Sequence, residues 1–256
     1  MGFDLFDRWG RRRSGLIFSP VSVLYFMILL LGLLLLSPLL LATLRDLMIV
    51  GLGLPPELAM GFLLLSLFGS FFNVPLYEIV SREPILTFRR ISFFGVTWNI
   101  PDVRIGTRKT LVTLNVGGAL VPILISAYIL GDLIPSREPS PLTTYLKFLI
   151  ALVVVTLVVH RSSRPIRGLG IATPAFIPPL TTALITLVLF PLGPVSNPYL
   201  IAYAAGTLGT LLGADLLNFR RFADLGAPVV SIGGAGTFDG IYTTGLASVL
   251  LLLLLL

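Results

Sequence analysis

Residues 16–43 read LIFSPVSVLYFMILLLGLLLLSPLLLAT and contain no Asp, Glu, Lys, Arg or His. An α-helix needs about 20 apolar residues to cross the hydrocarbon core of a bilayer, and this run is long enough. Six further runs that qualify or nearly qualify follow, at approximately residues 58–80, 110–131, 144–160, 170–191, 198–217 and 228–256. The sequence therefore predicts an all-α integral membrane protein: one transmembrane domain over residues 1–256, built as a bundle of about seven transmembrane helices.

The composition favours the same fold class. Hydrophobic residues make up 55% of the chain and charged residues 12%, and the mean hydropathy is +0.98; a soluble domain carries roughly a quarter charged residues. The net charge of +6 comes from basic clusters between apolar runs, which indicates membrane topology rather than nucleic-acid binding. The chain has no cysteine and a single histidine, His160, which excludes disulfides, thiolate chemistry and a histidine metal cage.

The loop charges predict the orientation of the bundle. Of the 18 basic residues, four precede the first predicted helix and six, three and two lie in alternate loops, so fifteen fall on one side. The positive-inside rule makes that side cytoplasmic, so we expect a cell-membrane protein with a cytoplasmic N-terminus and an external C-terminus. The first apolar run is longer than the 7–15 residues of a signal-peptide core, so we expect it to be retained as a helix.

The loop at residues 81–109 is the one sizeable segment outside the predicted helices. It is rich in β-branched and aromatic residues around a central Gly95. Such residues are enriched in strands. The loop therefore predicts a short cytoplasmic β-hairpin.

Two aspartates stand out within the predicted helices. Asp215 lies near the cytoplasmic end of the sixth helix, and Asp239 follows the glycine-rich residues 233–236 of the seventh. Ionisable residues inside membrane helices are rare and are candidates for function. If residues 229–236 form irregular backbone, a helix with Thr237 as its N-cap would begin near Phe238 and bring the two aspartates level. Because irregular backbone at membrane depth needs burial in protein or a water-filled cavity, this alternative predicts a cavity near both acids.

Other helix-breaking and polar residues fall in the same half of the predicted bundle, whereas the outer halves are mainly Leu, Ile, Val and Phe. They indicate a polar pocket that is open to the cytoplasm. We take Asp215 and Asp239 as candidate catalytic residues. The candidate substrate-binding residues are Asn73, Asn115, Thr173, Pro174, Asn218, Gly234, Gly236 and Thr237. No metal site and no cofactor are predicted.

These features also have simpler interpretations. Small residues spaced by four, as in residues 206–210 and 209–213, usually indicate close helix packing. Proline in a membrane helix often marks only a kink. Asp215 could pair with Arg220 or Arg221, and Asp239 could have a structural partner distant in sequence. His160 is expected to lie at the membrane interface.

Three runs resemble an uncharacterised prokaryotic membrane-protein family, known as a domain of unknown function. They are residues 170–174 (GIATP), 206–217 (GTLGTLLGADLL) and 231–241 (SIGGAGTFDGI). The resemblance covers roughly residues 60–250 and implies no activity.

A looser likeness has more functional content. Two aspartates on consecutive antiparallel helices, the second after a glycine-rich run, are similar to the GxGD intramembrane aspartyl proteases of the presenilin and signal-peptide-peptidase class. In that class the second aspartate directly follows Gly-x-Gly, whereas here Thr237 and Phe238 separate Gly234-Ala-Gly236 from Asp239. The class also has a Pro-Ala-Leu element downstream of that aspartate; the nearest counterpart here, Pro174-Ala-Phe176, lies upstream.

Three functions follow as hypotheses. The first is an intramembrane aspartyl protease in which Asp215 and Asp239 share one proton and cleave a transmembrane peptide substrate, with an edge strand of residues 81–109 holding the unwound substrate. The second is an ion- or proton-coupled carrier of small solutes that uses the same acidic pocket. The third is a non-catalytic membrane scaffold or lipid-binding protein whose arginines contact anionic lipid. Membrane lipid is the expected partner in each case, and no oligomeric state is predicted.

Overall fold

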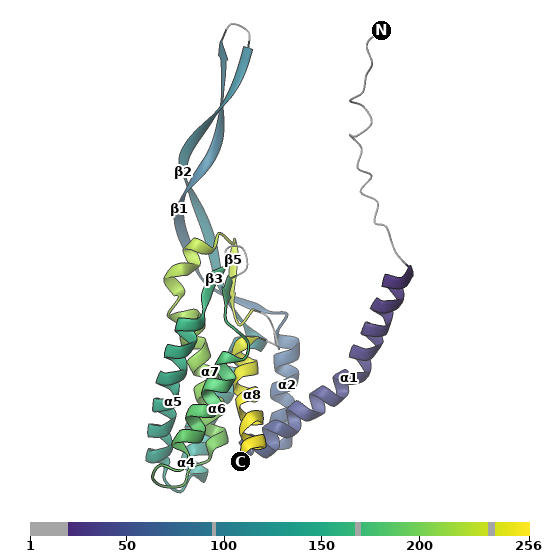
Figure 1. The fold of residues 1–256 in the computed structure, drawn as a ribbon, viewed down its shortest axis with the longest axis vertical. Coiled ribbons are helices and arrows are strands. Elements are labelled where there is room, and N and C mark those ends of the chain that lie inside the picture. Colours follow the sequence, from purple (N-terminus) through teal and green to yellow (C-terminus); the bar gives the residue numbers. More distant parts are fainter. Residues whose placement is uncertain (1–19, 94–95, 167–169, 235–238) are drawn as a thin grey trace. The chain divides into compact units, whose positions relative to one another are not determined.

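The computed structural model describes residues 20–93, 96–166, 170–234 and 239–256 (Figure 1). The chain divides into two units, residues 1–43 and 44–256. Helix α1 (Pro20–Leu52) crosses the boundary between them and contains Pro38. It ends nine residues later than the predicted limit of 43, because the apolar pattern resumes after Arg45 and Asp46. These two side chains form an ion pair of 3.6 Å within the helix.

The second unit is mostly helical. Its helices are α2 (Pro56–Gly69), α3 (Val121–Tyr128), α4 (Ile134–Arg137), α5 (Pro141–Ser162), α6 (Ile177–Leu189), α7 (Pro198–Thr210) and α8 (Gly240–Leu255). Wider π-helical segments, η1 (Val116–Leu120), η2 (Ile129–Leu133) and η3 (Leu211–Leu216), join or extend them, and η4 (Phe219–Leu225) is a 3₁₀ helix. Asn115 caps η1, since its side-chain oxygen accepts a hydrogen bond of 2.8 Å from the Gly118 amide.

Among the described residues, four helical stretches are long and apolar enough to cross a membrane: Leu24–Leu52, Val116–Arg137, Pro141–Ser162 and Pro198–Leu216. The other three predicted spans correspond to α2, α6 and α8, which have 14, 13 and 16 residues. Each of these is shorter than the roughly 20 residues that a regular spanning helix needs.

A long β-hairpin replaces the short one predicted at residues 81–109. Strands β1 (Asn73–Phe93) and β2 (Val96–Asn115) pair along their whole length, from Asn73 opposite Asn115 to Phe93 opposite Val96. Strand β5 (Val229–Ile232) adds to β2 in parallel, which gives the order β1-β2-β5. The helix predicted over 58–80 therefore ends at Gly69, because the β-branched and aromatic residues that follow favour a strand.

Three other predicted helices begin late for a related reason. The first residues of the 110–131 run belong to β2, so helical structure begins there at Val116. The first residues of the 170–191 run form strand β4 (Gly170–Ala172), which pairs with β3 (Arg164–Ile166). The first residues of the 228–256 run form β5, and Gly233, with φ of +69°, ends that strand in a conformation that favours glycine. The alternative prediction, in which the last helix begins only near residue 238, is therefore close to the structure. The N-cap of α8 is Asp239, however, and not Thr237 as predicted.

Helix α7 forms the centre of the bundle and packs against α5, α6 and α8. Its glycines allow the close contacts: a Cβ at Gly209 would lie 2.7 Å from Val155 of α5, and one at Gly206 would lie 3.1–3.3 Å from Thr182 of α6 and from α8. These contacts confirm that the small-residue pattern serves packing. The outward faces of the helices are apolar and exposed.

Candidate functional site

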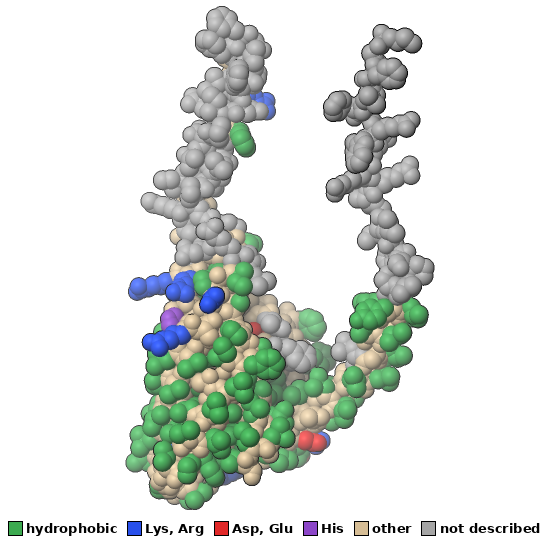
Figure 2. All heavy atoms as spheres, viewed as in Figure 1, with side chains coloured by type: hydrophobic (Ala, Val, Ile, Leu, Met, Phe, Trp, Pro, Cys, Tyr) green, Lys and Arg blue, Asp and Glu red, His purple; other side chains and the backbone are tan. Residues whose placement is uncertain are grey.

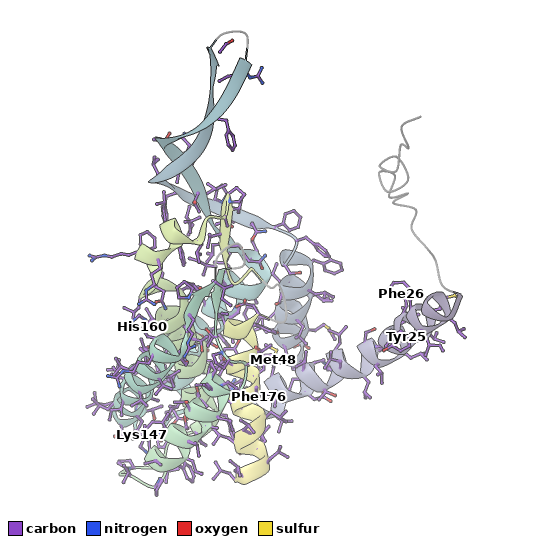
Figure 3. All side chains as sticks on the ribbon, turned by 45° about the horizontal axis from the view of Figure 1, so that its top comes forward. Tyr25, Phe26, Met48, Lys147, His160 and Phe176 are labelled. Atoms are coloured by element: carbon purple, nitrogen blue, oxygen red, sulfur yellow. The ribbon has the colours of Figure 1, made fainter. Side chains whose placement is uncertain are left out.

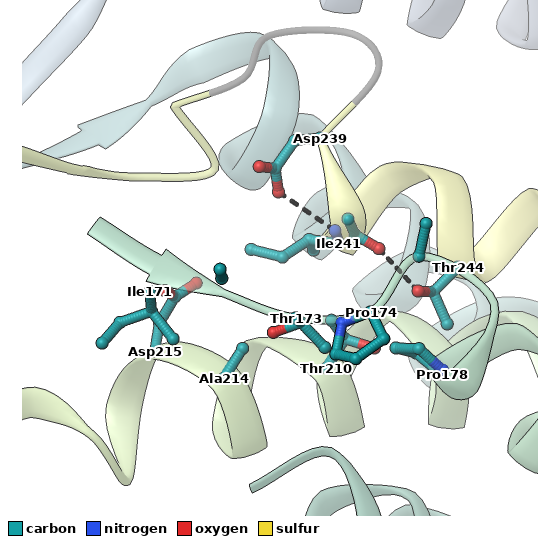
Figure 4. A pocket seen from close by; sticks show the side chains of 13 residues that line it. Ile171, Thr173, Pro174, Pro178, Thr210, Ala214, Asp215, Asp239, Ile241 and Thr244 are labelled. Carbon is teal, nitrogen blue, oxygen red and sulfur yellow. Dashed lines mark hydrogen bonds between the residues drawn. The ribbon is translucent and has the colours of Figure 1, made fainter. Parts of the chain in front are cut away.

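A cavity of about 250 Å³, seen from close by in Figure 4, is bordered by η3 and by the start of α8. This is the end of the bundle from which the hairpin extends in Figure 1. Both candidate catalytic aspartates line the cavity. They come from different elements, Asp215 from η3 and Asp239 from the start of α8. The other lining residues are Ile171, Ala172, Thr173, Pro174, Ala175, Pro178, Thr210, Ala214, Gly240, Ile241 and Thr244.

Asp215 is positioned by the end of the α7–η3 helix. Here the helix widens from α to π, a change that is often found at functional sites. The side-chain Nδ2 of Asn218 donates hydrogen bonds to the carbonyl oxygens of Gly213 (3.1 Å) and Ala214 (2.9 Å), which satisfies these carbonyls at the end of the helix. Gly213 holds it against α5, since a Cβ there would lie 2.5 Å from the Thr156 carbonyl oxygen. The backbone that carries Asp215 is therefore held by the Asn218 side chain and by the close contact with α5.

Asp239 is the N-cap of α8. Its Oδ2 accepts a hydrogen bond of 3.0 Å from the Ile241 amide, and its carbonyl oxygen accepts one of 2.8 Å from Thr243 Oγ1. A carboxylate at a helix N-terminus satisfies an otherwise unpaired amide and lies in the favourable field of the helix dipole. The fold thus supports a negative charge at this position.

The two carboxyl groups act on each other electrostatically. Asp239 exerts a like-charge interaction on Asp215, which is itself inside the protein. Figure 4 shows the two side chains reaching the same pocket from separate elements. At about 250 Å³ the cavity has room for several water molecules, and the like charge of the two acids opposes their simultaneous ionisation.

A second cavity, of about 480 Å³, shares both aspartates and Ile171 with the first. Its other walls are Gly170 of β4 and the β5 region: Ala227, Val229, Val230, Ser231, Gly233 and Gly234. In the described part of the sheet, β5 pairs on one side with β2 and is the last strand in the order. The acids therefore face a second space that is bordered by strand backbone.

The predicted substrate-binding residues fall into four groups, of which Asn73 and Asn115 form the last. Thr173, Pro174 and Gly234 line the cavities with the aspartates. Asn218 supports the backbone beneath Asp215, as described above. Gly236 and Thr237 lie outside the described residues.

Asn73 and Asn115 line neither cavity and instead join strands and helices. Asn115 Nδ2 donates to the Ser70 carbonyl oxygen (2.8 Å) and to Asn73 Oδ1 (3.2 Å). Asn73 Oδ1 also accepts a hydrogen bond of 2.6 Å from Ser231 Oγ. Since Ser231 lines the second cavity, the two asparagines reach the site through β5.

Thr210 and Thr244 line the first cavity and were not among the predicted residues. Each lies five residues from one of the aspartates, on the helical side, and this spacing was a signal available in the sequence. Thr244 Oγ1 donates to the Gly240 carbonyl oxygen, whereas Thr210 Oγ1 has no hydrogen-bond partner among the described residues. Within the described ranges, no group of three or more His, Asp or Glu side chains is placed to hold a metal ion.

A family model described as "Protein of unknown function (DUF1614)" matches residues 67–251. No curated protein and no solved structure matches the chain. The matched range includes the hairpin, both cavities and both aspartates.

Proposed function

The chain belongs to the DUF1614 family, whose function is unknown, and we propose from its own site that it is an intramembrane aspartyl protease. The observation that carries the proposal is the pair Asp215 and Asp239, which line one cavity from two different helical elements. An aspartic protease needs two carboxyls that face one water and one peptide bond, and the cavity provides two carboxyls and room for a water.

The proposal places the helices in the cell membrane as seven spans. The four long stretches cross fully, and α2, α6 and α8 cross with the help of the strands and turns that precede or follow them. Arg161, Arg164, Arg220 and Arg221 lie near the ends of elements at the cavity side, which makes that side cytoplasmic under the positive-inside rule. The cavity and the hairpin then face the cytoplasm, and the end of α8 faces outside.

In the proposed reaction, one carboxylate removes a proton from water as the water oxygen attacks the scissile carbonyl carbon. The other, protonated carboxyl donates its proton to the carbonyl oxygen, which gives a tetrahedral diol. Collapse of the diol breaks the C–N bond as the proton held by the first carboxyl passes to the leaving amine and a diol hydroxyl returns its proton to the second carboxylate, which restores both carboxyls to their starting states. The helix N-terminus at Asp239 stabilises that residue as the ionised partner, so Asp215 is assigned as the protonated acid at the start of the cycle.

The second cavity supports a substrate in extended conformation. Its wall contains Val229–Ser231 of β5, whose outer edge carries backbone groups able to pair with an added strand. The earlier expectation placed substrate pairing on residues 81–109, but β5 borders the acids directly. We therefore propose that an unwound transmembrane segment pairs with β5 and presents its carbonyl to Asp215 and Asp239.

The test is cleavage of a reporter transmembrane substrate by purified protein in detergent. Asp215→Asn and Asp239→Asn are each expected to lower the rate roughly 100- to 10,000-fold, the usual contribution of a positioned acid or base. Asp132→Asn provides a matched control, because Asp132 belongs to η2 and lines neither cavity. Cleavage that persists in both cavity variants would rule the proposal out.

One observation favours a second candidate, a proton-coupled carrier. Buried hydroxyls continue from the first cavity into the bundle: Thr182 and Thr186 on α6, Thr207 and Thr210 on α7, and Thr244 and Ser248 on α8. The hydroxyls of Thr186 and Thr210 lack hydrogen-bond partners among the described residues. Such a path could carry protons from the acids towards the other end of the bundle.

Flux in proteoliposomes separates the two candidates. A carrier would show proton-driven solute uptake that Asp239→Asn abolishes and Thr207→Val reduces. Uptake that Asp239→Asn leaves unchanged would exclude this form of transport. The protease assay does not depend on the hydroxyl path, so its outcome is independent.

A further inference from the structure

A third hollow shares part of its wall with the acid cavity. It measures about 490 Å³ and is lined by Ser162, Arg164, Ile166, Ala172, Thr173, Pro174 and Ile177. Ala172, Thr173 and Pro174 also line the first cavity. The segment 172–174, here called the partition, therefore borders both the acid cavity and this hollow, here called the outer groove.

The partition is attached to the end of α5. Ser163 Oγ and Thr173 Oγ1 are 2.7 Å apart and share a hydrogen bond, and Ser163 Oγ also donates to the Val159 carbonyl oxygen. Ser163 is buried, whereas Arg164, the next residue, is exposed at the groove. The groove thus combines a fixed inner wall with a cation at its rim.

An apolar track leads away from the groove along α6. Phe176, Leu180, Leu184 and Val188 are 78%, 46%, 58% and 62% exposed, and their spacing of four residues places them on one face of the helix. No ionisable residue occurs from Ile177 to Leu189. At 1.5 Å per residue this face is roughly 20 Å long, which is comparable to an extended acyl chain. Phe176, at the groove end of the track, is labelled in Figure 3.

The charge distribution fits the same kind of ligand. In Figure 2, the Lys and Arg side chains of the bundle gather mainly at the end from which the hairpin extends, and hydrophobic side chains cover most of the body beyond them. A cation beside a polar rim, followed by a long apolar face, matches a molecule with an anionic head and an aliphatic tail. A small soluble anion has no aliphatic part that could pack on the apolar track.

We propose that the outer groove binds an anionic phospholipid, with the phosphate at Arg164 and Ser162 and one acyl chain along Phe176, Leu180, Leu184 and Val188. The inference rests on the membrane placement in the proposed function but not on the protease chemistry. Because the headgroup would touch the partition 172–174, lipid occupancy bears directly on the wall of the acid cavity.

Native mass spectrometry of the full chain tests this proposal, with phosphatidylglycerol and phosphatidylcholine offered at equal concentrations. Wild-type protein is expected to retain phosphatidylglycerol preferentially. Arg164→Gln is expected to lower that retention about five-fold, the effect of removing one cation from an anionic lipid surface, and Arg164→Lys is expected to restore most of it. Arg220→Gln is the matched control, because Arg220 is exposed and does not line the groove.

Two results would overturn the site. One is equal retention of the two lipids by wild-type protein, and the other is an equal loss in Arg164→Gln and Arg220→Gln, which indicates diffuse attraction instead of a site. Glycerol 3-phosphate, which has the head but no tail, is expected not to displace the lipid, and displacement would refute the role of the apolar track. The measurement is repeated in Asp239→Asn, so that loss of proteolysis and loss of lipid binding are read separately.

Discussion

The two ends of the bundle both contain buried polar groups, but they use them differently. At one end Lys147 is buried, and its ammonium donates to the carbonyl oxygens of Phe190 (3.3 Å) and Pro194 (3.1 Å) and to Ser196 Oγ (2.9 Å). At the other end Asp215 and Asp239 face cavities. Figure 3 shows Lys147 and His160 towards opposite ends of α5, with His160 on the cavity side.

The difference separates a structural charge from a candidate functional one. Lys147 donates its hydrogen bonds to the loop between α6 and α7. Nearby, Glu138 Oε2 accepts hydrogen bonds from Thr144 Oγ1 and from the Asn197 backbone amide, at 3.0 Å each. An ionised group inside a protein is tolerated when protein partners replace its water. The aspartates instead retain access to space that a water or a substrate can occupy, so their charge remains available for chemistry.

The largest expected effect is the loss of proteolysis when either aspartate at the cavity end is replaced. Asp215→Asn and Asp239→Asn remove proteolysis by the factors given above, yet we expect the thermal unfolding of the protein in detergent to stay close to that of wild type. At residue 215, Asn replaces the carboxyl assigned as protonated with a neutral amide of similar size, and at residue 239 Asn is itself a good N-cap. A large loss of stability in both variants would mean that the pair is structural, as at the Lys147 end.

Lys147→Met should have the opposite outcome. Methionine keeps the apolar part of the side chain, one atom shorter, but leaves the Phe190 and Pro194 carbonyl oxygens without their donor, which costs about 1.5–3 kcal/mol for hydrogen bonds to a charged group. We expect a lower free energy of unfolding in detergent and an unchanged cleavage rate for the protein that remains folded. Unaltered unfolding would contradict the structural role of this lysine.

Gly213→Ala tests the contact that fixes Asp215 against α5. The added Cβ would lie 2.5 Å from the Thr156 carbonyl oxygen and 2.9 Å from Val159 Cβ, so backbone has to shift. Overpacking of this kind costs about 1–3 kcal/mol, and displacement of Asp215 should lower the cleavage rate as well. The control is Gly61→Ala in α2, where a Cβ meets nothing within 4 Å and alanine favours the helix. Equal stability of the two variants would refute the close contact between α5 and η3.

Apolar helices, and a cavity near Asp215 and Asp239, could be predicted from the sequence, because hydropathy and rare intramembrane charges are local signals. The hydropathy pattern misplaced the end of the second helix, since residues 71–80 are apolar enough for a helix and β-branched enough for a strand, and hydropathy does not separate the two. Asn115 was read as a site residue, although its amide joins elements that are distant in sequence.

The role of Lys147 was also not visible in the sequence. Its partners lie 43–49 residues away, and a lysine near a helix end is equally compatible with an exposed position. The meeting of Asp215 and Asp239 at one cavity was anticipated through the irregular backbone before Asp239, which is a local cue. The partners of Lys147, in contrast, lie in a loop that is distant in sequence, and no local pattern predicts where that loop packs.

The smallest expected effect concerns Tyr77 of β1, beside the cavity end. Its ring packs on Phe219 with centroids 5.0 Å apart, and its hydroxyl is buried with no hydrogen-bond partner among the described residues. Tyr77→Phe keeps the ring contact and removes only the unpaired hydroxyl, so the free energy of unfolding near pH 7 should change by less than about 0.5 kcal/mol, or increase slightly.

A pH series extends this test. Burial raises the pKa of Tyr77 above its ordinary value of 10.0, so the folded protein holds this proton more tightly than the unfolded chain does. The resulting stability is complete below pH 10 and is lost as the pH rises through the raised pKa. Wild type should therefore lose stability relative to Tyr77→Phe only in the alkaline range. A wild type that is more stable than Tyr77→Phe by more than about 0.5 kcal/mol at neutral pH would instead show that the Tyr77 hydroxyl has a hydrogen-bond partner, as Lys147 has.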